Sequence, residues 1–204
     1  MENLYLIVGL GNPGSDYSRT RHNAGFLVVE RLAERWRANW SYERKFDALL
    51  ARAELASRRV LLCRPQTYMN ASGEAVGAVK EFFRVALSRI LLVVDDADLP
   101  LGRLRLRPEG SSGGHHGLES VEQHLGTRNY ARLRVGIGRV DGAREITGHV
   151  LGRFGSTEAL LVDKVLSAAA DQAETWLGAG IQKAMNQFNR VSFERDLGNE
   201  GKAQ

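Results

Sequence analysis

Polar residues capable of chemistry gather at four places in the sequence, each beside an apolar run. Asn12 and His22 belong to the first place, Asn70 to the second, Asp95 to the third and His116 to the fourth. Binding and catalytic side chains of α/β proteins usually lie in loops at one edge of the sheet. We therefore expect the elements that carry these residues to bring them together at such an edge.

Asp95 and His22 form the candidate catalytic pair. Asp95 directly follows the apolar run 90–94, which indicates the carboxyl end of a buried strand. Alone, such a carboxylate is more often a turn or capping residue, as we expect for Asp96 and Asp98, and a lone His22 is more often a surface residue. Both stand at strand-to-helix junctions, however. Together they indicate an imidazole that takes a proton from water while a carboxylate orients it.

The histidine spacing does not favour a metal site. His115 and His116 are adjacent, so their side chains tend to point apart, and the sequence has no His-x-x-x-His or paired-cysteine spacing. We therefore expect hydrolysis without a metal ion or another cofactor.

A glycine-rich segment with nearby arginines is the candidate phosphate contact. The glycines of residues 110–117 allow backbone amides to approach a ligand closely, although such a segment can also be a plain flexible loop. Arg107 alternates with Arg103 and Arg105, and a strand would place the three guanidinium groups on one face. Arg134 is either a further phosphate contact or a solvated arginine on a strand face.

The opening strand runs into a Gly-x-Gly-x-x-Gly pattern at residues 9–14, the letters of a dinucleotide-binding turn. That motif requires a helix that begins inside the glycines and points at a pyrophosphate. Residues 15–23 are instead polar and lack a helical period. We expect a loop here. The interpretation of the chain as a nucleotide-dependent oxidoreductase is therefore supported by the glycines alone.

Apolar runs and turn residues predict the elements that position these side chains. Strands are expected over residues 4–9, 46–54, 58–64, 89–94, 103–107 and 131–137, and helices over 23–37, 71–84, 117–125, 157–177 and 180–190. Their alternation predicts one α/β domain over residues 1–196, a mixed twisted β-sheet flanked by helices. The polar residues 197–204 are expected to be a disordered tail, and the glycines of 139–156 suggest a mobile lid.

Composition narrows the function classes. The 204-residue chain carries a net charge of +4, which favours a polyanionic partner over a basic one. Its apolar runs fall short of the ~20 residues of a membrane span, and its first residues lack the features of a signal peptide. Cys63 is the single cysteine of the sequence, which fits a buried, inert thiol in a reducing compartment. We expect a cytoplasmic protein.

Six segments, in order along the first two-thirds of the chain, resemble the bacterial peptidyl-tRNA hydrolase family. They are Val-Gly-Leu-Gly-Asn-Pro-Gly at 8–14, Thr-Arg-His-Asn-Ala-Gly-Phe at 20–26, Arg-Pro-Gln-Thr-Tyr-Met-Asn-Ala-Ser-Gly at 64–73, Asp-Asp-Ala-Asp-Leu-Pro-Leu-Gly at 95–102, Gly-Gly-His-His-Gly-Leu at 113–118 and Leu-Arg-Val-Gly-Ile-Gly at 133–138. Six matches in register make the resemblance specific.

The resemblance implies hydrolysis of the ester that joins a peptidyl, or N-blocked aminoacyl, group to the 3′ end of tRNA. This reaction recycles tRNA from aborted translation. By position, the resemblance implies that His22 is the general base that activates water and that Asp95 orients it. Asn12 would recognise the N-acylated form of the substrate. We expect a monomer that acts on peptidyl-tRNA without an obligate protein partner.

Further contacts follow from the same resemblance. Asn70, Tyr17 and Tyr68 would hold the acceptor end of tRNA and the peptide. Arg107 and Arg134 would contact tRNA phosphates, which contributes affinity that falls as salt rises.

One position departs from the family pattern. The family has Gly-Gly-His-Asn-Gly where this chain has His116 in place of the asparagine, which is associated with the acceptor end and the catalytic water. Histidine also donates and accepts, but it is larger and titratable. This departure is the one feature that favours the alternative of a non-catalytic RNA-binding relative, whereas the intact His22, Asp95, Asn12 and Asn70 argue against it.

Overall fold

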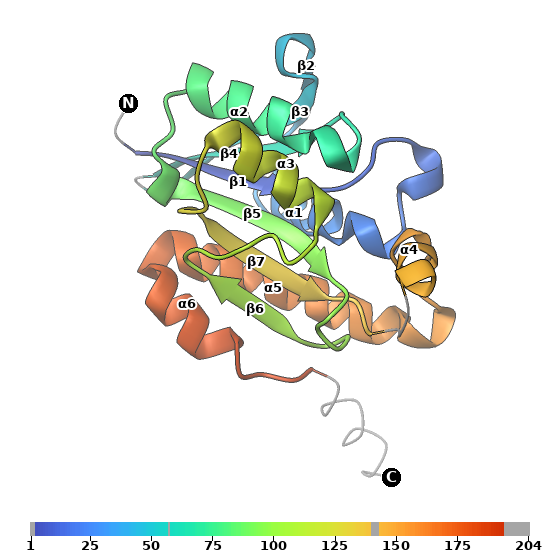
Figure 1. Cartoon of the computed structure of the whole chain (residues 1–204). Coiled ribbons are helices and arrows are strands. Elements are labelled where there is room, and N and C mark those ends of the chain that lie inside the picture. Colours follow the sequence, from blue (N-terminus) through green and yellow to red (C-terminus); the bar gives the residue numbers. More distant parts are fainter. Residues whose placement is uncertain (1–2, 57, 140–142, 194–204) are drawn as a thin grey trace.

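The computed structural model describes residues 3–56, 58–139 and 143–193, and within them seven strands form one mixed sheet (Figure 1). In chain order the strands are β1 (Leu4–Gly9), β2 (Trp40–Glu43), β3 (Ala48–Leu55), β4 (Arg58–Pro65), β5 (Ile90–Asp96), β6 (Leu104–Arg107) and β7 (Ala131–Gly136). Their order across the sheet is β2-β3-β4-β1-β5-β7-β6. The central strands β4, β1, β5 and β7 are parallel, whereas β2, β3 and β6 are added antiparallel.

Helices cover both faces of the sheet. The helices are α1 (Ala24–Arg35), α2 (Ser72–Phe82), α3 (His116–Leu125), α4 (Ala143–Leu151), α5 (Ala159–Ala179) and α6 (Ile181–Phe188). Helix α4 lies against the 3₁₀ turn before α1 and not over a face of the sheet. Alternate strand residues point to opposite faces. Ile7 and Leu91 belong to the core shared with α1 and α5. Leu6 and Leu92 belong to the core shared with α2 and α3. The predicted fold class, a single α/β domain with a mixed sheet flanked by helices, is confirmed.

Two elements differ from the sequence-based expectation. The four-residue strand β2 was not predicted, because it is short and its residues are exposed or half-exposed, and it is defined by pairing with β3. The segment 139–156, predicted as a lid, contains helix α4, whose Gly148 had been read as a loop signal. Mobility of this segment stays a prediction. Residues 140–142 and the predicted tail 197–204 lie outside the described residues.

Gly9 and Gly25 allow helix α1 to lie directly against the end of β1. A Cβ atom on Gly9 would collide with the carbonyl of Gly25, and one on Gly25 would collide with the carbonyl of Val93. Helix α1 begins at Ala24, after two 3₁₀ turns, and not inside the glycines of residues 9–14. Gly9 and Gly11 therefore serve close packing, Gly14 allows a turn with a positive φ, and the dinucleotide-binding reading is wrong.

The edge strand β6 is held by a side chain that follows α6. Asn189 donates from Nδ2 to the carbonyl of Leu106 at 3.0 Å, and its Oδ1 accepts the Leu106 N–H at 2.8 Å. The buried Gln172 of α5 donates to the same Oδ1 at 3.1 Å. Arg105 and Arg107, on either side of Leu106, are exposed. The amide therefore fixes the register that turns both arginines outward.

Two expectations from composition concern Cys63 and membranes. Cys63 is buried in β4, and burial raises the pKa of its thiol, which agrees with an inert structural residue. Among the described residues, none of the helices combines the length and the apolar character that crossing a membrane demands.

We expect Gly25→Ala to lower the free energy of unfolding by about 2–3 kcal/mol, since the added methyl group must displace backbone atoms of Val93 and Leu10. The matched control is Gly178→Ala in the last turn of α5, where a Cβ meets no atom within 4 Å. This control variant should raise the free energy of unfolding by about 0.5–1 kcal/mol. Urea unfolding measures both changes, and a neutral Gly25→Ala would contradict the packing argument.

Candidate active site

A cavity of about 760 Å³ lies at the carboxyl ends of the parallel strands. The predicted site residues that line it are Asn12, His22, Tyr68, Asn70, Asp95, His116 and Arg134. Helix α4 adds the apolar side chains Ile146, Val150 and Leu151. Tyr17, half-buried in the loop after β1, and Arg107, exposed on β6, are not among the lining residues.

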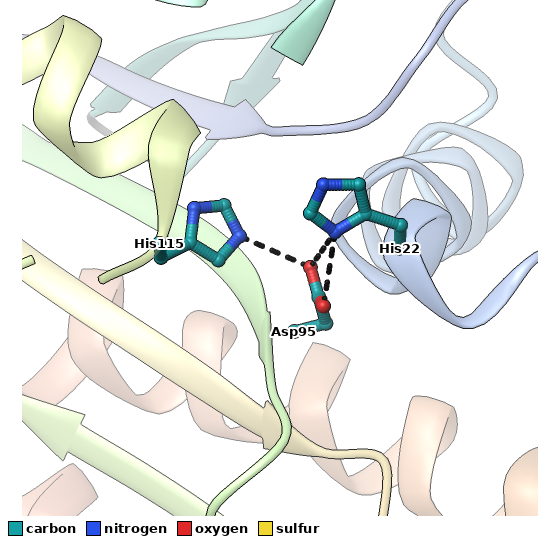
Figure 2. Close-up of side chains that lie close together, drawn as sticks. All are labelled: His22, Asp95 and His115. Atoms are coloured by element: carbon teal, nitrogen blue, oxygen red, sulfur yellow. Dashed lines mark hydrogen bonds and ion pairs between the residues drawn. The ribbon is translucent and has the colours of Figure 1, made fainter. Parts of the chain in front are cut away.

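His22 stands in the 3₁₀ turn before α1 and meets Asp95 at the end of β5 (Figure 2). Its Nδ1 lies 2.9 Å from Oδ1 and 3.0 Å from Oδ2 of Asp95. A carboxylate only accepts, so the hydrogen is assigned to Nδ1 and the Nε2 atom keeps its lone pair. Nε2 points away from Asp95 in Figure 2. The ring is thus arranged to accept a proton from a water molecule in the cavity.

His115 also contacts the Asp95 carboxylate, and sequence reasoning missed this residue in favour of His116. Its Nε2 lies 3.1 Å from Oδ1 of Asp95. Its Nδ1 accepts the backbone N–H groups of Gly117 at 3.1 Å and Leu118 at 3.3 Å, as the N-cap of α3. Because backbone N–H groups only donate, Nδ1 has no hydrogen and Nε2–H donates to Asp95. The position of His115 directly before α3 could have indicated this role, since the free backbone N–H groups at a helix N-terminus require a hydrogen-bond acceptor.

The Asp95 carboxyl is ionised although it is buried. Burial would raise the pKa of this group, but the contacts with His115 and then His22 outweigh burial and hold the pKa well below its usual range. The buried charge is therefore satisfied by hydrogen bonds from two imidazoles.

His22, Asp95 and His115 are also the one group of described residues whose geometry would suit a metal ion, since their three ligand atoms lie within 4.8 Å of one another. The hydrogen bonds of His115 do not fit that use. A histidine that ligates through Nε2 donates a hydrogen from Nδ1, yet this Nδ1 faces two N–H donors. The arrangement thus favours a hydrogen-bonded triad over a metal centre, and metal-free hydrolysis stays a prediction.

Asn12 joins the opening loop to the turn before α2. Its Oδ1 accepts the Met69 N–H at 2.8 Å. Its own backbone is held by Asn23, whose side chain accepts the Asn12 N–H at 2.8 Å and donates to the Asn12 carbonyl at 3.0 Å. With the amide oxygen committed to Met69, the Nδ2 group is the part of Asn12 that can donate to a ligand carbonyl.

Arg134 lies beneath the loop before α3. Its guanidinium donates to the carbonyls of Ser111 at 2.8 Å and Ser112 at 2.9 Å, and pairs with Asp96 at 3.3 Å. The fully buried Arg132 of the same strand donates to this loop as well. The solvated reading of Arg134 is therefore wrong, because its side chain anchors the loop. A phosphate contact through the 13% that remains exposed stays a prediction.

The remaining predicted residues stand at the mouth of the cavity. His116 opens α3, has a 75% exposed side chain and contacts Oε2 of Glu119 through Nδ1 at 3.1 Å. Tyr68 is 63% exposed, and Asn70 is exposed in the 3₁₀ turn before α2. These side chains can meet a ligand that enters from outside.

Comparison with known proteins gives consistent matches. A family model described as peptidyl-tRNA hydrolase matches residues 6–196. The peptidyl-tRNA hydrolase of Synechococcus sp. (strain JA-3-3Ab) is 48% identical over 93% of this chain and 84% of the relative. That of Geobacillus kaustophilus is 46% identical over 90% of this chain and 98% of the relative. The crystal structure of peptidyl-tRNA hydrolase from Acinetobacter baumannii superposes with a TM-score of 0.89 at 39% identity, covering 95% and 98% of the two chains.

The lowered pKa of Asp95 predicts a specific loss of stability in acid. A carboxyl group with a folded-state pKa below its unfolded value, ~3.9, stabilises the fold above that value and loses this contribution as the pH falls toward the folded pKa. Between about pH 5 and pH 2, the free energy of unfolding should therefore fall more steeply for wild type than for Asp95→Asn. Urea titrations across this range measure both slopes.

The control for this measurement is Asp98→Asn, which removes an exposed carboxylate three residues away and should keep the wild-type slope. Parallel slopes for wild type and Asp95→Asn would contradict the assignment.

Proposed function

Because the chain belongs to the peptidyl-tRNA hydrolase family and hydrolyses peptidyl-tRNA, we propose that His22 is the general base of this reaction and that Asp95 orients it. One observation carries the proposal. Asp95 receives the Nδ1 hydrogen of His22 on both carboxylate oxygens, which leaves Nε2 as the basic atom on the cavity side. The alternative of a non-catalytic RNA-binding relative is set aside, since the similar proteins are hydrolases and this pair is intact.

The proposed reaction needs one proton carrier. Nε2 of His22 takes a proton from water as the oxygen attacks the carbonyl carbon of the peptidyl ester. The imidazolium that forms is stabilised by the ionised Asp95. When the tetrahedral intermediate breaks down, the bond to the ribose 3′ oxygen is cleaved and this oxygen takes the proton from His22. The base is thereby restored, and the products are a peptide with a free carboxyl group and tRNA.

Neutral amides are proposed to hold the substrate. Asn12 donates from Nδ2 to a carbonyl of the N-blocked peptide, because its Oδ1 is already bound to Met69. Asn70 and Tyr68, exposed at the mouth, contact the peptide and the acceptor end. Amides recognise a peptide backbone whatever its side chains, which suits an enzyme that must accept any nascent chain. Tyr17, outside the cavity, is proposed to contact more distant parts of the substrate.

The proposed tRNA contact extends beyond the cavity. Arg107 is exposed on β6 and is available to phosphates, while Arg134 contacts them through the part of its side chain that the loop leaves exposed. The net charge of +4 supports a polyanionic substrate. We further propose that one domain over residues 1–196 acts as a monomer in the cytoplasm, without an obligate protein partner.

We expect His22→Ala to lower kcat for release of tRNA from an N-acetylated aminoacyl-tRNA by a hundredfold or more, roughly the contribution of a general base. The control is His124→Gln, which changes a histidine on α3 that bonds to the Ser120 carbonyl, away from the cavity. Thermal unfolding of each variant separates loss of chemistry from loss of fold. Equal activity of wild type and His22→Ala would refute the mechanism.

His116 should influence turnover from the mouth of the cavity. We expect His116→Asn to raise kcat or to shift the pH dependence of kcat/KM, because it replaces a bulky titratable ring with a neutral amide. Glu119→Gln is the companion variant, since it removes the negative charge that faces His116 and leaves the His116 ring in place. If His116→Asn leaves both the rate and the pH profile unchanged, the position is not coupled to the chemistry.

A further inference from the structure

The turn that carries His22 is fastened to the chain segment that follows α4. The backbone N–H of Arg21 donates to the Gly152 carbonyl at 2.9 Å, and Thr20 forms an isolated β-bridge with Arg153. Residues 152–158 are far from residue 21 in the sequence, yet they lie directly on the turn before α1. The position of His22 therefore depends on this segment.

The Arg21 side chain makes most of this attachment. Its Nη1 donates to the Arg153 carbonyl, and its Nη2 pairs with Oε2 of Glu158 at 2.7 Å. The guanidinium carbon lies 5.0 Å from the centre of the Phe154 ring. The side chain of Arg21 is only 12% exposed. A planar fork that binds two acceptors and stacks on a ring at a partly buried site cannot be replaced by an ammonium group.

The same segment continues from a wall of the cavity. Helix α4 places Ile146, Val150 and Leu151 along the cavity that His22 lines, and residue 152 follows directly. At its other contact, Nε2 of His149 lies 3.0 Å from the Ile137 carbonyl just after β7. The apolar wall is thus held to the sheet by His149 and to the His22 turn by Arg21.

We propose that Arg21 is a positioning residue that joins the apolar wall of α4 and the His22 base into one unit. Four contacts end on this one residue: the Gly152 and Arg153 carbonyls, Glu158 and Phe154. We call this set the Arg21 clasp. The inference rests on the proposed role of His22, and it assigns a function to a residue that the sequence analysis left without a role.

The clasp predicts a distinctive kinetic effect. If wall and base move together, loosening the clasp misplaces both, so kcat falls and KM for a substrate with an apolar peptide rises. A change in the wall alone, such as Ile146→Ala, should raise KM by a larger factor than it lowers kcat. Small displacements of a reacting group are costly, so Arg21→Lys should lower kcat/KM by roughly tenfold.

The test compares Arg21→Lys, Glu158→Gln and the double variant with a matched pair elsewhere. Arg31 and Asp163 form a similar ion pair between α1 and α5, at 2.6 Å, and neither residue lines the cavity. Steady-state kcat and KM are measured on N-blocked aminoacyl-tRNA, and thermal unfolding shows which fraction of each variant is folded. We expect the effects of the two single changes to be less than additive in the double variant, since both act on the contact between Arg21 and Glu158. Arg31→Lys and Asp163→Asn should keep wild-type kinetics.

The proposal is overturned if folded Arg21→Lys retains wild-type kcat and KM, or if Arg31→Lys changes them equally. Glu158→Gln keeps a hydrogen-bond acceptor and tests the clasp should Arg21→Lys fold poorly. His22→Ala separates the two hypotheses. An inactive His22→Ala beside unaffected clasp variants would reject only the clasp, whereas an active His22→Ala would reject the general base itself.

Discussion

The whole site depends on one buried negative charge, the Asp95 carboxylate at the end of β5. Burying a charged carboxylate lowers the stability of the fold unless its oxygens accept hydrogen bonds. Here the donors are two imidazole rings, so the charge fixes which nitrogen of each ring carries the hydrogen that faces it. His22 must present Nδ1–H, and His115 must present Nε2–H. The free lone pair of His22 is therefore placed on Nε2, on the cavity side, by its contact with Asp95.

The two histidines reach this charge from opposite faces of the sheet. His22 precedes α1, whose core lies with α5, whereas His115 precedes α3, whose core lies with α2. Angstrom-level placement from both sides requires that the helices approach the sheet and one another closely. Gly25 allows α1 to approach the sheet closely, because it has no side chain. Gly73 likewise allows α2 to approach the Ser120 carbonyl of α3. Small residues at these contacts thus determine the geometry of a site that contains none of them.

The sequence allowed the central strands, most helices and the His22–Asp95 pair to be predicted, because position at strand ends and the family resemblance both pointed to them. His115 was missed because its role depends on which nitrogen caps α3, a choice that the sequence does not record. The solvated alternative for Arg134 was wrong because alternation along β7 places a side chain on a face but does not reveal that a distant loop returns over it. Helix α4 was not predicted because Gly148 disfavours a helix in the sequence pattern, whereas tertiary context can override that preference.

The contact between Asn189 and Leu106 has a consequence for how copies of this protein behave toward one another. An outermost strand with free N–H and C=O groups is a template on which a second chain can add a strand and begin aggregation. The Asn189 amide occupies both groups of Leu106, much as a neighbouring strand would. The outward Arg105 and Arg107 add like charges that repel an identical edge. The edge that carries an arginine proposed to contact RNA is thereby made a poorer template for a second strand.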